Sequence, residues 1–115
     1  MTDKRIAGHR SSLGAFGETM AASFLERNGA RVIARNVAVG RGEIDLMADE
    51  GEGLFVVEVK TATESDDDHP RWNFTDRKAD QVARLARSMG VRRVDLVTVV
   101  VGANGLDLEW HRRVA

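Results

Sequence analysis

Two β-prone stretches joined by a glycine-containing turn constrain this chain more than any other feature of its sequence. Residues 54–61 are rich in valine and in other apolar residues such as Phe55. In residues 43–48, the apolar Ile44, Leu46 and Ala48 alternate with Glu43, Asp45 and Met47. A period of two with β-branched and aromatic residues is typical of a strand. The glycines and acidic residues of segment 49–53 indicate a turn. The sequence therefore predicts a β-hairpin over residues 43–61.

The hairpin brings acidic side chains together if its turn is centred between residues 51 and 52. Residues whose numbers sum to 103 then face each other, so that Asp45 lies opposite Glu58 and Glu43 lies opposite Lys60. Opposed carboxylates repel, and a cation has to compensate for the repulsion. A divalent cation is one candidate, because magnesium is bound through one or two carboxylates plus waters. Lys60 alone, in a cross-strand ion pair, is the other candidate, and the spacing leaves both open.

The other predicted elements give an α/β fold in which two helices pack against a mixed β-sheet, in the order α-β-β-β-α-β-β. The first helix starts at Ser11 or Ser12, and Gly29 stands where a left-handed stop is expected. Segment 94–101 is almost continuously apolar, which predicts a strand buried on both faces. The remaining predicted elements are a strand at 32–39, an open loop at 62–74, a helix from Thr75 or Asp76 to Met89, and a strand at 106–110.

Two charged residues lie on or beside the apolar stripes of the predicted helices. Glu18 lies at the edge of the first stripe, next to small residues such as Gly14 and Ala21. Its carboxylate is either solvated or closely approached by another element. Lys78 falls within the stripe of the second helix. It either extends past the core to solvent or points into a site as a cation that faces phosphate.

Length and composition restrict the class of protein. The 115 residues fit one domain, with a core at about 11–112 and a flexible N-terminal arm at 1–10. The absence of cysteine excludes disulfides, zinc-thiolate sites and thiol nucleophiles. No apolar run approaches the roughly 20 residues that a membrane-spanning helix needs, and the first residues lack the apolar stretch of a signal peptide. We therefore expect a cytoplasmic protein with no membrane association.

The formal charge of −1 hides a segregation of charge along the chain. Residues 1–42 carry seven basic and three acidic groups, residues 43–68 carry one basic and ten acidic groups, and residues 69–115 carry nine basic and five acidic groups. The small total taken alone disfavours a nucleic-acid-binding protein, since phosphate binding usually needs a basic excess. The distribution instead places an acidic centre between two basic arms, which reflects either chance together with an acidic loop or a functional arrangement.

Several strings of residues, taken in order, resemble a known family. They are Leu13-Gly14 with Gly17-Glu18 and Ala21, Arg35-Asn36, Gly42-Glu43-Ile44-Asp45-Leu46, Phe55-Val56-Val57-Glu58-Val59-Lys60, Lys78, and Arg93-Val94-Asp95. An Asp on one strand and a Glu-x-Lys on the next resemble the core of the PD-(D/E)XK nuclease superfamily, and the whole set resembles the YraN-like family of bacterial proteins. The resemblance spans about residues 11–100. It implies a restriction-endonuclease-like fold, similar also to archaeal Holliday-junction resolvases.

The resemblance also implies a catalytic site and its metal. Asp45 and Glu58 match the metal-binding carboxylates, together with the carbonyl oxygen of Val59, and Glu18 matches a helix carboxylate that completes the metal shell. Lys60 matches the lysine that orients or activates the attacking water. The implied cofactor is Mg²⁺, with Mn²⁺ as a substitute.

The implied activity is hydrolysis of phosphodiester bonds in DNA, in branched or damaged intermediates among other forms. Arg10, Arg41 and Lys78 are the candidate nucleic-acid contacts. The family often has a basic residue where this chain has Ala62, which removes one phosphate contact. The alternative is a catalytically silent module that retains the nuclease fold and binds nucleic acid or a protein partner. A homodimer is compatible with the first reading, because cleavage of a duplex needs two sites.

Overall fold

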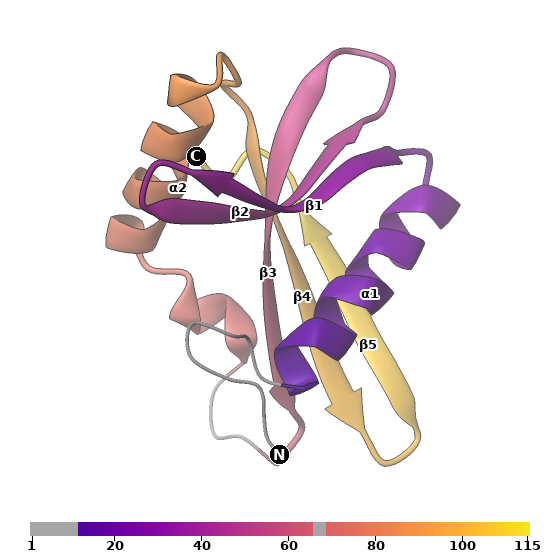
Figure 1. Ribbon diagram of the computed structural model, residues 1–115. Coiled ribbons are helices and arrows are strands. Elements are labelled where there is room, and N and C mark those ends of the chain that lie inside the picture. The colour runs from indigo at the N-terminus through magenta and orange to yellow at the C-terminus, as the bar shows by residue number, and fades with distance from the viewer. Residues whose placement is uncertain (1–11, 66–68) are drawn as a thin grey trace, which may run out of the picture.

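The structure, a computed structural model, describes residues 12–65 and 69–115 and has the predicted element order (Figure 1). Arg10 and the predicted arm at residues 1–10 lie outside the described residues, as does the acidic stretch 66–68. Neither of its two α-helices is long and apolar enough to cross a membrane. The elements are α1 (Ser12–Arg27), β1 (Arg31–Val39), β2 (Gly42–Asp49), β3 (Leu54–Thr63), the short 3-10 helix η2 (Pro70–Asn73), α2 (Asp76–Ser88), β4 (Val94–Gly102) and β5 (Gly105–His111).

The five strands form one mixed sheet, which confirms the predicted fold class. The strand order is β1-β2-β3-β4-β5, and only β3 and β4 run parallel to each other. A parallel pair needs a long crossover connection, and here α2 lies within that connection. β3 is therefore the central strand, with an antiparallel neighbour on one side and a parallel neighbour on the other.

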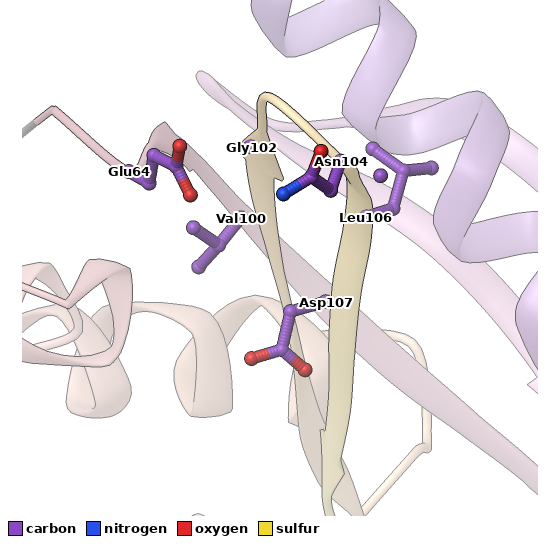
Figure 2. Close-up of a pocket in the computed structure, with 7 residues that line it drawn as sticks. Glu64, Val100, Gly102, Asn104, Leu106 and Asp107 are labelled. Carbon is purple, nitrogen blue, oxygen red and sulfur yellow. The ribbon is translucent and has the colours of Figure 1, made fainter.

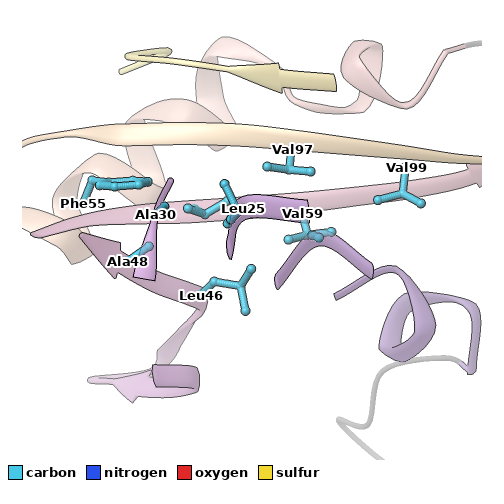
Figure 3. Packing of buried hydrophobic residues seen from close by; sticks show 10 residues of the cluster. Leu25, Ala30, Leu46, Ala48, Phe55, Val59, Val97 and Val99 are labelled. Carbon is cyan, nitrogen blue, oxygen red and sulfur yellow. The ribbon is translucent and has the colours of Figure 1, made fainter. Parts of the chain in front are cut away.

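The two helices cover opposite faces of the sheet and create two separate apolar clusters (Figure 1). Figure 3 shows the α1 side, where Leu25 packs among side chains of β2, β3 and β4. β4 contributes to both clusters, as its continuous apolar run predicted. The α1 cluster has Ala21, Leu25, Ala30, Leu46, Ala48, Phe55, Val57, Val59, Val97 and Val99. The α2 cluster has Ile44, Met47, Val56, Val82, Ala83, Ala86, Val91 and Val94.

The ends of the helices follow the signals in the sequence, whereas the connection before α2 does not. Gly29 and Gly90 adopt positive φ angles of 98° and 79°, which favour glycine over residues that have a Cβ. The hydroxyl of Thr75 accepts a hydrogen bond from the Lys78 N–H and caps α2. The predicted open loop at 62–74 is shorter than expected, because β3 continues to Thr63 and η2 forms inside the segment. Pairing with β4, which the local sequence does not encode, extends the strand.

α1 approaches β3 so closely that one helix position has no room for a side chain. A Cβ atom built on Gly17 would lie 1.8 Å from Oγ1 of Thr61, which is far inside van der Waals contact. The next residue is Glu18, which shares the sheet-facing side of the helix with Ala21 and Leu25. The absence of a side chain at Gly17 thus sets the depth at which Glu18 is buried.

We predict that Gly17→Ala destabilises the protein, although alanine is the better helix former by about 1 kcal/mol. The added methyl group displaces either α1 or Thr61, and overpacking of this kind costs roughly 1–3 kcal/mol. Thermal unfolding followed by circular dichroism measures the effect, with Ser23→Ala on the same helix as a control. A melting temperature equal to or above that of the wild type would contradict the close contact between α1 and β3.

Candidate active site

The predicted register of the β2–β3 hairpin is confirmed, but only for part of its length. Four cross-strand pairs have residue numbers that sum to 103, from Asp49 with Leu54 to Leu46 with Val57. The ladder ends there, so the expected ladder pairing of Asp45 with Glu58 is wrong. The same holds for the pairing of Glu43 with Lys60. The two strands separate at the point where the acidic residues begin.

A side chain replaces the backbone pairing at the point where the strands separate. The N–H of Val59 donates a hydrogen bond of 2.8 Å to Oδ2 of Asp45. This bond satisfies a backbone donor that the missing strand pair would otherwise leave open. It also fixes the Asp45 carboxylate against the edge of β3, next to Glu58.

Asp45 and Glu58 form a close carboxyl pair that is shielded from water. Glu58 is only 8% exposed, and its carboxyl lies close enough to that of Asp45 for the two to interact electrostatically. Burial and the adjacent charge of Glu58 raise the pKa of Asp45 from 3.8 to about 7, against the lowering effects of the Val59 N–H and of Lys60. With this pKa a substantial fraction of Asp45 is protonated at neutral pH, and a bound cation would favour its ionised form.

Lys60 provides one positive charge at this pair. Its Nζ atom lies 3.2 Å from Oε2 of Glu58, and the Lys60 side chain is 22% exposed. The predicted partner of Lys60 across the strands was Glu43, but the ammonium group pairs with the glutamate of its own Glu-x-Lys motif. Glu58 thus contacts both the lysine and Asp45.

A pocket of about 230 Å³ opens onto the two carboxyl groups. Its walls come from β2, β3 and α2, so that the strand separation and the helix together form it. Lys78 lines this pocket and is also exposed to solvent, and its contact with phosphate stays a prediction. Gln81 also lines it and was not identified from the sequence, although its spacing of three residues from Lys78 places both on one side of a helix. The lining residues are Gly42, Glu43, Asp45, Glu58, Lys78, Gln81, Val82 and Leu85.

The other candidate residues lie outside this pocket. Glu18 is buried in α1, at 6% exposure, rather than solvated at the edge of the apolar stripe. Burial of a carboxylate is costly unless it is compensated. Arg41 is exposed in the turn between β1 and β2, next to the pocket residue Gly42. The predicted roles of Glu18 in metal binding and of Arg41 in nucleic-acid binding remain predictions.

The donor set at the pocket fits a divalent cation that keeps most of its waters. In residues 12–65 and 69–115 no group of three or more His, Asp or Glu side chains is arranged to hold a metal ion. Mg²⁺, however, is usually bound through only one or two carboxylates together with water and substrate oxygens. Asp45 and Glu58 supply those carboxylates. A cation bound there would compensate for the charge of both groups.

A larger hollow, of about 490 Å³, lies at the end of β3 and the β4–β5 turn (Figure 2). Glu64 and Asp107 line it together with Val100 and Leu106 and the turn residue Asn104. The Glu64 carboxylate accepts a hydrogen bond from the backbone N–H of Ala103, which ties the end of β3 to the turn. The lining of this hollow contains no Lys or Arg among the described residues, whereas the smaller pocket contains Lys78 beside Asp45 and Glu58.

Comparison with known structures supports the class of fold. The structure aligns with Archaeoglobus fulgidus Hjc, a Holliday junction resolvase from an archaeal hyperthermophile, with a TM-score of 0.53 and 16% sequence identity, over 86% of this chain and 76% of that one. At this identity the likeness shows a shared nuclease-like fold and nothing finer.

The sequence comparison places the chain in one family. The model of "Uncharacterised protein family UPF0102", the YraN-like family, matches residues 17–99, and the chain belongs to this family. A UPF0102 protein of Streptomyces coelicolor is 38% identical over 90% of this chain and 88% of its own length. A UPF0102 protein of Streptomyces griseus is 37% identical over 90% of this chain and 95% of its own. The family resemblance predicted from the sequence is thereby confirmed.

We predict that Asp45 makes the metal-free protein less stable as the pH rises from about 4 to about 7. The folded state binds more protons than the unfolded state across this window, because the pKa of Asp45 is raised in the folded state. The contribution is on the order of 2–4 kcal/mol. Chemical denaturation in EDTA at pH 4.5 to 8 measures it as the difference between wild type and Asp45→Asn. A difference that does not change with pH would contradict the buried carboxyl pair.

We also predict that millimolar Mg²⁺ or Mn²⁺ raises the melting temperature at pH 8, where a cation relieves the repulsion between the carboxylates. Binding at 100 times the dissociation constant stabilises by about 2.7 kcal/mol, which is several degrees for a domain of this size. Asp45→Asn should abolish the shift, whereas Asp107→Asn in the larger hollow should leave it intact. Equal shifts in both variants would place the cation elsewhere.

Proposed function

We propose that this protein is a metal-dependent nuclease that hydrolyses phosphodiester bonds in DNA, with Mg²⁺ as the physiological cation and Mn²⁺ as a substitute. The proposal rests on one observation: Asp45, Glu58 and Lys60 lie close together where β2 separates from β3. Two carboxylates and an ammonium group in a shielded pocket are costly for folding, and phosphoryl transfer is a chemistry that requires such a set. The nuclease-like fold supports the same reading.

In this proposal Asp45 and Glu58 hold the cation, helped by the carbonyl oxygen of Val59. When bound, the cation would supply Lewis-acid stabilisation of the charge that develops on the phosphoryl oxygens. The hydrogen bond from the Val59 N–H keeps the Asp45 carboxylate oriented without any reorganisation during the reaction. The small volume of the pocket admits a phosphodiester group and limits the number of waters around it.

Lys60 is the proposed catalytic residue that faces the attacking water. Glu58 holds its ammonium group at 3.2 Å, so that the lysine is already positioned before the substrate arrives. An ammonium group at this place donates hydrogen bonds to the nucleophile and to the non-bridging oxygens of the phosphate. Lys78, on the opposite wall of the pocket, adds a second positive charge toward the substrate.

The alternative is a catalytically silent module that binds nucleic acid or a protein partner. One observation favours it over the nuclease: Ala62 stands where the family often has a basic residue, and it is buried, so one phosphate contact is missing. The module retains the fold and the binding surface but has no turnover. This alternative therefore predicts that the protein binds its ligand but cleaves no nucleic acid, whichever divalent metal is added.

We predict that the wild type with Mg²⁺ or Mn²⁺ cleaves at least one member of a panel of labelled duplex, single-stranded, flapped and four-way-junction DNA. Lys60→Ala should lower the cleavage rate by about 100-fold or more, the usual size of a lost proton-transfer or positioning group. Lys60→Ala should still show the Mg²⁺-dependent rise in melting temperature, since both carboxylates remain. That second readout separates a role in the reaction from a role in metal binding.

Two outcomes would overturn the proposal in different ways. Absence of cleavage of DNA and of matched RNA under all metals would favour the silent module. Equal cleavage by wild type and Lys60→Ala would identify a contaminating nuclease, so both proteins are purified in parallel with Asp45→Asn.

A further inference from the structure

Exposed cations cover the side of α2 that faces solvent, beside the pocket. Arg77, Arg84 and Arg87 are exposed on the helix, and Arg92 is exposed shortly after it. In the part of the chain that the structure describes, none of their side chains makes an ion pair or a hydrogen bond. We call these four residues the α2 basic face. Segment 76–92 as a whole has five cations, these four and Lys78, against the two carboxylates of Asp76 and Asp80.

The α2 basic face begins at the pocket and runs toward the end of the helix. Residues three, four or seven apart share one side of a helix. Gln81 lines the pocket, and Arg84 lies one turn further along on the same side. Arg77 and Arg84 are seven residues apart, and Arg87 follows Arg84 by three. Asp80 is exposed on the same side, so a negatively charged chain that leaves the pocket along α2 would meet three arginines and one carboxylate on the helix, a net positive charge.

The far end of this path is a hollow that suits an anion. Arg87 and Arg92 line a space of about 300 Å³ around Gly90, just beyond the end of α2. From Lys78 to Arg87 the helix rises by about 13.5 Å. One strand of a duplex carries a phosphate about every 3.4 Å along its axis, so this length corresponds to about four phosphates.

The carboxylates around β5 and the β4–β5 turn repel the same negatively charged ligand. Glu64 and Asp107 line the large hollow beyond β4 (Figure 2), and Glu109 is also exposed on β5. Lys60 is already paired with Glu58. The field of the protein thus favours a polyanion over α2 and disfavours it over β5.

We propose that a nucleic-acid strand that enters the pocket runs along α2, and that Arg77, Arg84, Arg87 and Arg92 bind its phosphates. The inference deepens the proposed function and rests on it for the identity of the ligand. Guanidinium groups on an exposed helix face contact phosphate oxygens without reading base edges, so the binding is independent of sequence. Its affinity falls steeply with salt, because each neutralised phosphate releases counterions.

The test measures binding without cleavage, by fluorescence anisotropy of labelled single-stranded and duplex DNA in EDTA at several salt concentrations. The test variant is Arg84→Gln with Arg87→Gln. The control is Arg27→Gln with Arg31→Gln, which removes the same charge near the end of α1. The α2 variant should bind about 10- to 100-fold more weakly at low salt, with a salt slope smaller by about 1.5–2. The control should bind within about threefold of the wild type.

Equal weakening in both variants, no weakening in the α2 variant, or no binding by the wild type would overturn the inference. A preference for membranes would also overturn it. In that case the wild type would bind vesicles containing phosphatidylserine more tightly than DNA, and the α2 variant would lose this binding. Melting temperatures of both variants confirm that they are folded. A separate cleavage assay distinguishes this inference from the proposed nuclease function. If the wild type cuts DNA and the α2 variant binds and cuts DNA equally well, only the role of the α2 basic face is overturned.

Discussion

The separation of β2 from β3 after Leu46 is the constraint on which the rest of the site depends. A continued hairpin ladder would satisfy the backbone of β3, but it would leave no room for the pocket between these strands and α2. The chain instead satisfies the Val59 N–H with the Asp45 carboxylate. One hydrogen bond thereby completes the backbone and orients an acidic group. The site is built into the fold at the point where regular sheet structure ends.

The same arrangement carries an energetic cost that the rest of the fold has to offset. Asp45 and Glu58 share a shielded space, and the pKa of Asp45 rises to about 7 as a consequence. Perturbed carboxyl groups in clefts are typical of functional sites. Two apolar clusters, one on each face of the sheet, supply the stabilisation that allows such a pair to persist. Lys60 reduces the repulsion without removing it, which leaves the pair suited to bind a further cation.

Charge is distributed over the surface in a way that matches this interpretation. The acidic groups close to the pocket are few, and others lie around the β4–β5 turn and at Glu64. Exposed arginines lie along α2 instead. A net charge near zero therefore says little about what the protein binds, because the cations outnumber the carboxylates along α2 while carboxylates line the hollow at the β4–β5 turn. The arrangement in space, rather than the total, decides where a polyanion can approach.

The sequence by itself determined the order of the elements, the stop at Gly29, the cap at Thr75 and the register of the hairpin turn, because each depends on local dihedral preference or on short-range periodicity. It also placed Asp45, Glu58 and Lys60 in one region of the hairpin, although the spacing paired Lys60 with Glu43 and the structure pairs it with Glu58. Tertiary structure alone decided where the hairpin ladder ends, that Glu18 is buried, and that Lys78 and Gln81 line the same pocket as Asp45. Those features depend on how α1 and α2 dock on opposite faces of the sheet. Docking is a long-range balance of packing that no local pattern encodes.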